Sequence, residues 1–184
     1  MSRNSLAVAT SEHKHIVHEG VGMSEVMSAS AVPLRHTVAT VVYRAAKTLR
    51  GAPEGFESYR AKPDSRTPVE ILAHISDLFD WAISIARGAE QWHDAPPQKW
   101  DSEVDRFFKT VGAFDEVLSA PSGIACSPEL LFQGSIADAL THIGQLAMLR
   151  RMEGMPIRGE SYFRAEIAVG RVGPDQAAPR REFD

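Results

Sequence analysis

The stretch from Ser135 to Leu149 carries the residue types best suited to chemistry. It contains no proline, it is largely apolar, and its only ionisable side chains are Asp138 and His142. Because these two residues are four positions apart, they lie on one face of a helix about one turn apart. Gln145, three residues beyond His142, extends the same polar stripe. Burial of an unpaired charge is costly, so an acid and an imidazole on one stripe of an apolar helix require a physical reason.

A third candidate side chain, His74, belongs to a different helix, expected from Thr67 to about Gly88. The sequence Thr67-Pro68-Val69-Glu70 is a capping box with proline at the first helical position. The apolar positions that predict the buried face are Ile71, Ile75, Leu78, Ala82 and Ile85. His74 lies at the edge of this face, whereas Asp77, Asp80 and Ser84 lie on the far side and are expected to meet water.

Metal sites in helical bundles form from side chains that project inward from facing helices. His74 on one helix and the pair Asp138 and His142 on another would supply two nitrogens and one carboxylate, with open positions for water or substrate. This ligand set suits zinc, nickel or ferrous iron. Gln145 is the candidate catalytic residue, because near such a site it could orient water or a ligand.

Two other interpretations of the same stripe stay open. Ser135 and Asp138 match the capping-box pattern, in which case Asp138 would simply cap its own helix. Alternatively, Asp138 and His142 form a local acid–imidazole contact worth only about 0.3 kcal/mol. The apolar stripe of this helix (Ile136, Leu140, Ile143 and Ala147) lies roughly opposite, which would allow the polar stripe to face outward.

Four predicted helices give an all-α four-helix bundle with long interhelix connections. The two remaining helices are expected at Pro33 to Arg50 and at Trp100 to Ser119, the latter with its acids mostly outward. We expect a flexible N-terminal tail at residues 1–30 and the bundle at residues 31–156. Residues 157–184 are expected to form a C-terminal extension whose last ten or so residues are loose. The fourth helix runs from Ser135 to about Glu153, and Arg150 and Arg151 are expected at its solvated end.

Composition limits the classes of partner. The chain has 184 residues, enough for one domain with a real core, and its formal net charge of -4 gives no general attraction to nucleic acid or anionic membrane. No apolar run approaches the length of a bilayer span, and the N-terminus lacks a sustained signal-peptide core. The single Cys126 cannot form an internal disulfide, which suits the cytoplasm.

The runs VEILAHISDLFDWA and ADALTHIGQLAMLRRMEGMPI resemble the DinB-like (DinB/YfiT-type) family of four-helix-bundle metalloenzymes, over about residues 33–156. The resemblance implies a divalent metal held by three side chains, usually histidines. One ligand on the second helix corresponds to His74, and an H-x-x-x-H pair on the last helix is commonly followed by glycine and glutamine, as in His142-Ile143-Gly144-Gln145. Asp138 stands where the family pattern has the first histidine, so metal preference and affinity are expected to differ.

The resemblance further implies metal-dependent transfer or isomerisation of a small-molecule substrate with a low-molecular-weight thiol as cofactor. The alternative is a non-catalytic, stress-related or ligand-binding bundle with a vestigial metal site, for which a homodimer is an open arrangement. Nucleic-acid binding is disfavoured by the acidic net charge and by the lack of a basic face.

Overall fold

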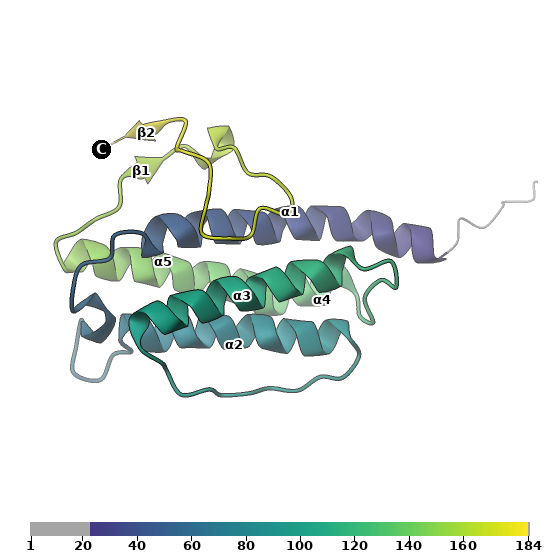
Figure 1. Ribbon diagram of the computed structural model, residues 1–184, viewed down its shortest axis with the longest axis horizontal. Helices are drawn as coiled ribbons and strands as arrows, with labels where there is room; N and C mark the ends of the chain where they lie inside the picture. The colour runs from purple at the N-terminus through teal and green to yellow at the C-terminus, as the bar shows by residue number, and fades with distance from the viewer. Residues whose placement is uncertain (1–22, 184) are drawn as a thin grey trace, which may run out of the picture.

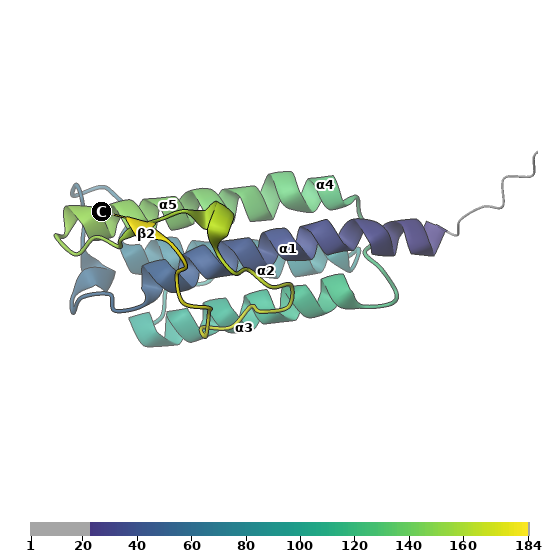
Figure 2. The ribbon, with the colours of Figure 1, turned by 90° about the horizontal axis from the view of Figure 1, so that it is seen from above.

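The computed structural model describes residues 23–183, with side chains from residue 32 onward, so residues 1–22 of the expected N-terminal tail lie outside it. Within this part of the chain, four long helices form the bundle: α1 (Met23–Leu49), α2 (Pro68–Ala86), α3 (Trp100–Ser119) and α5 (Ala137–Met152). Helices α3 and α5 each pack against both α1 and α2, so the four surround one core (Figures 1 and 2). The expected all-α class is confirmed. None of the described helices combines the length and the apolar character that crossing a bilayer requires.

Helix α1 begins at Met23, upstream of Pro33, where the sequence pattern placed its first turn. The upstream residues are small and polar without an apolar period, so no pattern marked them as helical. Pro33 therefore lies inside the helix, where its missing N–H removes one main-chain hydrogen bond. The predicted core stripe of this helix is confirmed as buried: Leu34, Val38, Val41, Val42, Ala45 and Leu49.

The N-terminus of α2 forms the predicted capping box. The Thr67 hydroxyl accepts a hydrogen bond from the Glu70 N–H at 3.3 Å, and the Glu70 carboxylate accepts one from the Thr67 N–H at 2.7 Å. Without these side chains, both main-chain N–H groups would be unpaired at the start of the helix. This requirement explains why the sequence predicts the boundary correctly. Along α2, the predicted inward residues are buried except Ile85, which is only partly covered.

The connection between α2 and α3, residues 87–99, runs back along α2 (Figure 1). Helix α3 therefore starts near the N-terminal end of α2, and the two helices point in the same direction. Helix α3 has the predicted bounds, but the expectation that its acids face outward is wrong for Glu103 and Asp115, which are buried. Asp115 accepts two hydrogen bonds from Arg35 of α1, at 2.8 and 2.7 Å, which compensates its burial.

Arg150 is buried, contrary to the expectation of a solvated helix end. Its guanidinium donates hydrogen bonds to the main-chain carbonyls of Thr48, Arg50 and Gly51, at 2.8, 2.8 and 2.9 Å. These carbonyls belong to the C-terminal end of α1, where no further helical N–H can pair with them. Arg150 thus joins the ends of α1 and α5, whereas its neighbour Arg151 is exposed.

Replacement of Arg150 by alanine should lower the free energy of unfolding by about 3 kcal/mol, because three main-chain carbonyls lose their charged hydrogen-bond donor in a buried environment. Urea denaturation followed by far-UV circular dichroism measures the loss. The matched control is Arg151→Ala, an identical change on the exposed neighbour, expected to cost less than about 0.5 kcal/mol. Equal losses in the two variants would show that Arg150 does not anchor α1.

The C-terminal extension is attached to α1. Strand β1 (Gly159–Glu160) pairs antiparallel with β2 (Glu182–Phe183), so the prediction that the last ten or so residues are loose is wrong for Glu182 and Phe183. Buried Glu160 accepts hydrogen bonds from Tyr43 at 2.7 Å and from Lys47 at 2.8 Å, and Lys47 also binds Glu182 at 2.8 Å. Figure 2 shows the extension lying across α1, the helix that contains Tyr43 and Lys47.

Candidate metal centre

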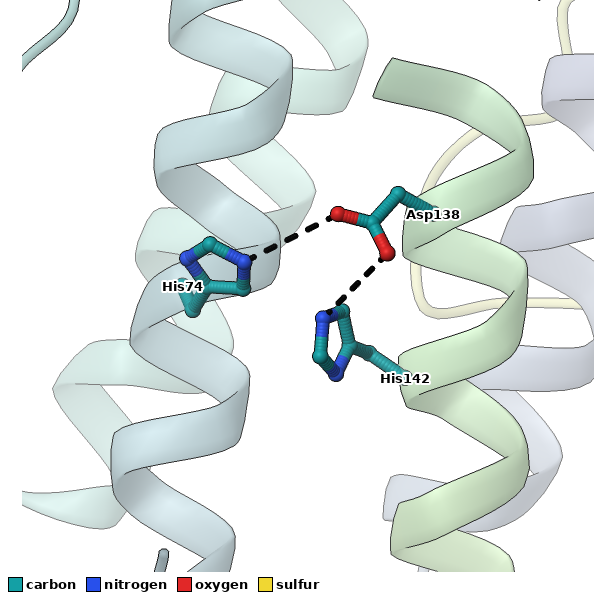
Figure 3. Close-up of side chains that lie close together, drawn as sticks. All are labelled: His74, Asp138 and His142. Atoms are coloured by element: carbon teal, nitrogen blue, oxygen red, sulfur yellow. Dashed lines mark ion pairs between the residues drawn. The ribbon is translucent and has the colours of Figure 1, made fainter. Parts of the chain in front are cut away.

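His74 lies on α2 at the edge of the buried face, with its ring directed toward α5 (Figure 3). Its neighbour Ile75 is fully buried and Leu78, one turn later, is nearly so, which fixes the rotation of α2 about its axis. The His74 side chain is 21% exposed. This position allows a ring nitrogen to reach the groove between α2 and α5 while the helix backbone stays packed.

The segment before α5 is already helical. A short helix, α4 (Pro128–Leu131), leads into a π-helical turn, Phe132–Ile136, and then directly into α5. The capping-box interpretation of Asp138 is therefore wrong, because Ser135 lies inside the π turn and not at a helix start. The Ser135 hydroxyl is buried without a hydrogen-bond partner in the described structure. Single π turns inside helices are frequent at functional sites.

The structure brings together the three predicted ligands. His74, Asp138 and His142 each offer a donor atom, and these atoms lie within 4.8 Å of one another. One Asp138 oxygen is 3.4 Å from Nε2 of His142, and the other is 3.9 Å from Nε2 of His74 (Figure 3). The two imidazole rings stand edge to face, with centroids 4.8 Å apart. Asp138 thus bridges one histidine on its own helix and one on the facing helix.

Gln145 determines which nitrogen of His142 faces the site. Its side-chain oxygen lies 2.9 Å from Nδ1 of His142, and because an amide oxygen only accepts, Nδ1–H donates the hydrogen bond. Nε2 is then the nitrogen that faces Asp138. Outer hydrogen bonds of this kind orient metal-binding histidines.

The pKa of His74 is lowered from its ordinary value of 6.5. Burial is the main cause, followed by the neighbouring His142 and the charge of Arg66, and together they outweigh the opposite influence of Asp138 and Asp77. His74 is therefore neutral at pH 7, the form in which imidazole binds metals. Since the unfolded chain takes up this proton more readily, His74 reduces folding stability as the pH falls below 6.5.

The three donors could hold a metal ion. Around a tetrahedral zinc ion with bonds near 2.1 Å, neighbouring ligand atoms are about 3.4 Å apart. The His142–Asp138 separation already has this value, and the widest separation would have to narrow by about 1.4 Å, within reach of side-chain rotation. Asp138 is 47% exposed, so the solvent side of the group remains open to water or to a ligand.

Comparison with known proteins adds no identification. No family model matches the chain, and neither curated proteins nor solved structures give a match. The functional interpretation therefore depends on the geometry of the chain itself.

The residues that hold the loop of residues 87–99 against α2 were not predicted from the sequence. Asp77, Asp80 and Ser84, expected to meet water, all bind this loop. Asp77 accepts from the Ala95 N–H at 3.2 Å, Asp80 pairs with His93 at 2.9 Å, and the Ser84 hydroxyl accepts from the Gln91 N–H at 2.9 Å. Three polar residues on one helix face are a usual sign of solvent exposure, so their spacing alone did not reveal the loop.

The loop carries Trp92 to the candidate centre. Its indole packs edge to face on His74, with centroids 5.8 Å apart, and in the same way on Trp81 at 5.9 Å. Trp92 is 44% exposed, so it covers one side of the His74 ring and still meets solvent. A tryptophan in a polar, proline-rich loop is the sequence signal that could have identified this residue, because exposed aromatic residues in loops are often binding residues.

A buried charge network lies behind His74, between α2 and α3. Arg106 donates to Asp77 at 2.8 Å, to Glu103 at 2.6 Å and to the carbonyl of Ala73 at 2.7 Å. Asp77 and Glu103 are almost fully buried, so the guanidinium compensates two carboxylates at once. Because Ala73 precedes His74, the network also fixes the backbone that presents the histidine.

Proposed function

We propose that His74, Asp138 and His142 bind one divalent metal ion, such as zinc, nickel or ferrous iron. We further propose that the chain is a DinB-like metalloenzyme that uses a low-molecular-weight thiol to transfer a group to, or isomerise, a small molecule. The resemblance of residues 33–156 to that family supports the reaction class, and the geometry of the three side chains supports the metal.

The orientation of His142 is the observation that carries the proposal. With Nδ1–H directed to Gln145, Nε2 of His142 faces a carboxylate oxygen of Asp138 at 3.4 Å, so both atoms can bind the same cation. The second oxygen of Asp138 faces His74, whose lowered pKa keeps it neutral at pH 7. A metal ion satisfies all three donors together, which a single proton cannot do.

Each side chain has a defined role under this proposal. The two imidazoles and Asp138 would hold the metal, which lowers the pKa of a bound thiol and so supplies a nucleophile at neutral pH. Gln145 keeps the proton of His142 on Nδ1, and Trp92 shields one side of His74 from water. The exposed side of Asp138 leaves access for the thiol and the substrate.

Cobalt substitution tests the thiol chemistry. The untagged protein, loaded with one equivalent of Co²⁺, should develop a thiolate-to-cobalt charge-transfer band when a suitable small thiol is added. The thiols that give the band are then assayed with a panel of electrophilic acceptors. If cobalt binds but no thiol produces the band, the thiol-dependent reaction is wrong and a metal-binding, non-catalytic bundle is the better description.

The variant Gln145→Leu should bind zinc about ten- to a hundredfold more weakly, because His142 loses the partner that holds its ring and its tautomer. Gln145→Glu keeps an oxygen acceptor for Nδ1–H and should retain most of the affinity. Zinc competition with a chromophoric chelator measures both. Gln98→Leu, the same substitution in an exposed loop position, is the control; a loss as large in Gln98→Leu would contradict the role of Gln145.

A further inference from the structure

A hollow of about 470 Å³ adjoins the candidate centre on the His142 side. It lies between α5 and the segment that leads into α2. The residues that line it are Ser65, Arg66, Ile71, His142, Gln145, Met148 and Leu149. Its volume falls within the range of small-molecule sites, which is about 300–1,000 Å³.

The lining divides into an apolar floor and a cationic edge. Ile71 and Leu149 are buried, and Met148 is half exposed, so together they offer an aliphatic surface to a ligand. Arg66 is the permanently charged residue of the lining, and the described lining contains no carboxylate. Apolar walls with a few convergent polar groups are typical of sites that bind small organic molecules.

The Arg66 guanidinium is available to a ligand. It is exposed, and no described residue forms a hydrogen bond or an ion pair with it. Other arginines of the bundle are engaged, such as Arg106 with Asp77 and Arg35 with Asp115. A free guanidinium offers a planar set of donors that fits a carboxylate or a similar oxyanion.

A hollow on the opposite side of the centre differs in charge. It has a volume of about 350 Å³, lies on the His74 side and also includes Arg66. Besides Arg66 and Arg60, which pairs with Glu70, four carboxylates line it: Asp64, Glu70, Asp77 and Asp94. These acids repel an anion, so an anionic ligand that pairs with Arg66 is favoured on the His142 side.

We propose that the hollow beside His142 binds a small organic anion, in which an oxyanion group pairs with Arg66 and an apolar body rests on Ile71, Met148 and Leu149. The ligand then extends toward His142 and Gln145. This inference names the substrate class for the function proposed above and depends on that function only for the reaction, because the pairing with Arg66 requires no metal.

Two fluorescent probes with one ring system test the charge requirement in metal-free protein. The anionic probe is 8-anilinonaphthalene-1-sulfonate, and the neutral probe is N-phenyl-1-naphthylamine. Arg66→Gln should weaken binding of the anionic probe about tenfold or more, because a charge-assisted pairing is lost, and should change binding of the neutral probe less than twofold. The control Arg151→Gln removes the same charge from an exposed position outside the hollow and should leave both affinities unchanged.

Methionine methyl labelling locates the bound probe. The Met148 signal, assigned with Met148→Leu, should shift when the anionic probe is added to the wild-type protein and should stay in place in Arg66→Gln. No shift of Met148, or equal weakening by Arg66→Gln and Arg151→Gln, would overturn the proposed anion site. Zinc affinity measured on the same Arg66→Gln protein separates the two proposals: it should not fall below the wild-type value whether or not the anion binds, because Arg66 is a cation near His74 and is not a metal ligand.

Discussion

The variant His142→Ala should bind a divalent metal ion more than about a hundredfold more weakly than the wild-type protein. Residues that only orient a ligand contribute about ten- to a hundredfold to metal affinity, so loss of a ligand itself should cost more. His74→Ala should have a comparable effect, because it removes the donor from the facing helix. Zinc affinity is measured by chelator competition at pH 7, and metal content per chain by mass spectrometry of protein purified without a histidine tag.

The control for this prediction is His36→Ala, which removes an exposed histidine of α1 that is not part of the donor group. Its zinc affinity should equal that of the wild-type protein. Asp138→His creates a three-histidine ligand set and should bind zinc at least as tightly. Metal content far below one per chain that does not fall further in His142→Ala would exclude the metal centre.

The variant Arg106→Ala should lower the free energy of unfolding by about 4 kcal/mol. Removal of one partner from a buried ion pair leaves an uncompensated charge, and here Asp77 and Glu103 are both left in that state. Burial already raises the pKa of Asp77, against the opposing influence of Arg106. Without Arg106 that pKa rises further, so the deficit should shrink as the pH falls from 7 toward 4, where the carboxyl is protonated. Urea denaturation at several pH values measures both effects.

Arg180→Ala is the matched control, because Arg180 pairs with Glu166 on the surface. Exposed pairs contribute less than about 1 kcal/mol, so this variant should be nearly as stable as the wild-type protein. A similarly small loss in Arg106→Ala would show that the buried network does not stabilise the bundle. Weaker zinc binding by a folded Arg106→Lys variant would further indicate that the network positions His74 through Ala73.

Local signals in the sequence predicted much of the bundle correctly. The capping box at Thr67 and Glu70 involves groups within one turn, and the bounds of α3 follow from an apolar period and flanking loops. The candidate ligands could be chosen for a similar reason, since Asp138 and His142 are one helical turn apart. In contrast, α1 upstream of Pro33 has no apolar period, and its start could not be predicted.

Local patterns were misleading where the environment of a residue depends on chain segments outside the pattern. A serine three residues before an acid suggested a cap at Ser135, but the helix had already begun at α4, so the motif lies in its interior. Polar residues on the outer face of α2 suggested solvent, but a returning loop covers them. In both cases the residue type was compatible with two environments, and only the path of the chain distinguished them.

The sequence alone determined which residues could bind a metal and which helices carry them, because residue type and helical period are local properties. Only the tertiary structure decided that His74 meets Asp138 and His142, since this depends on how α2 packs against α5. It also decided that Arg150, 102 residues after Thr48, is a buried anchor. Burial and pairing of charges are set by contacts between elements distant in the chain, and spacing along one helix contains no information about them.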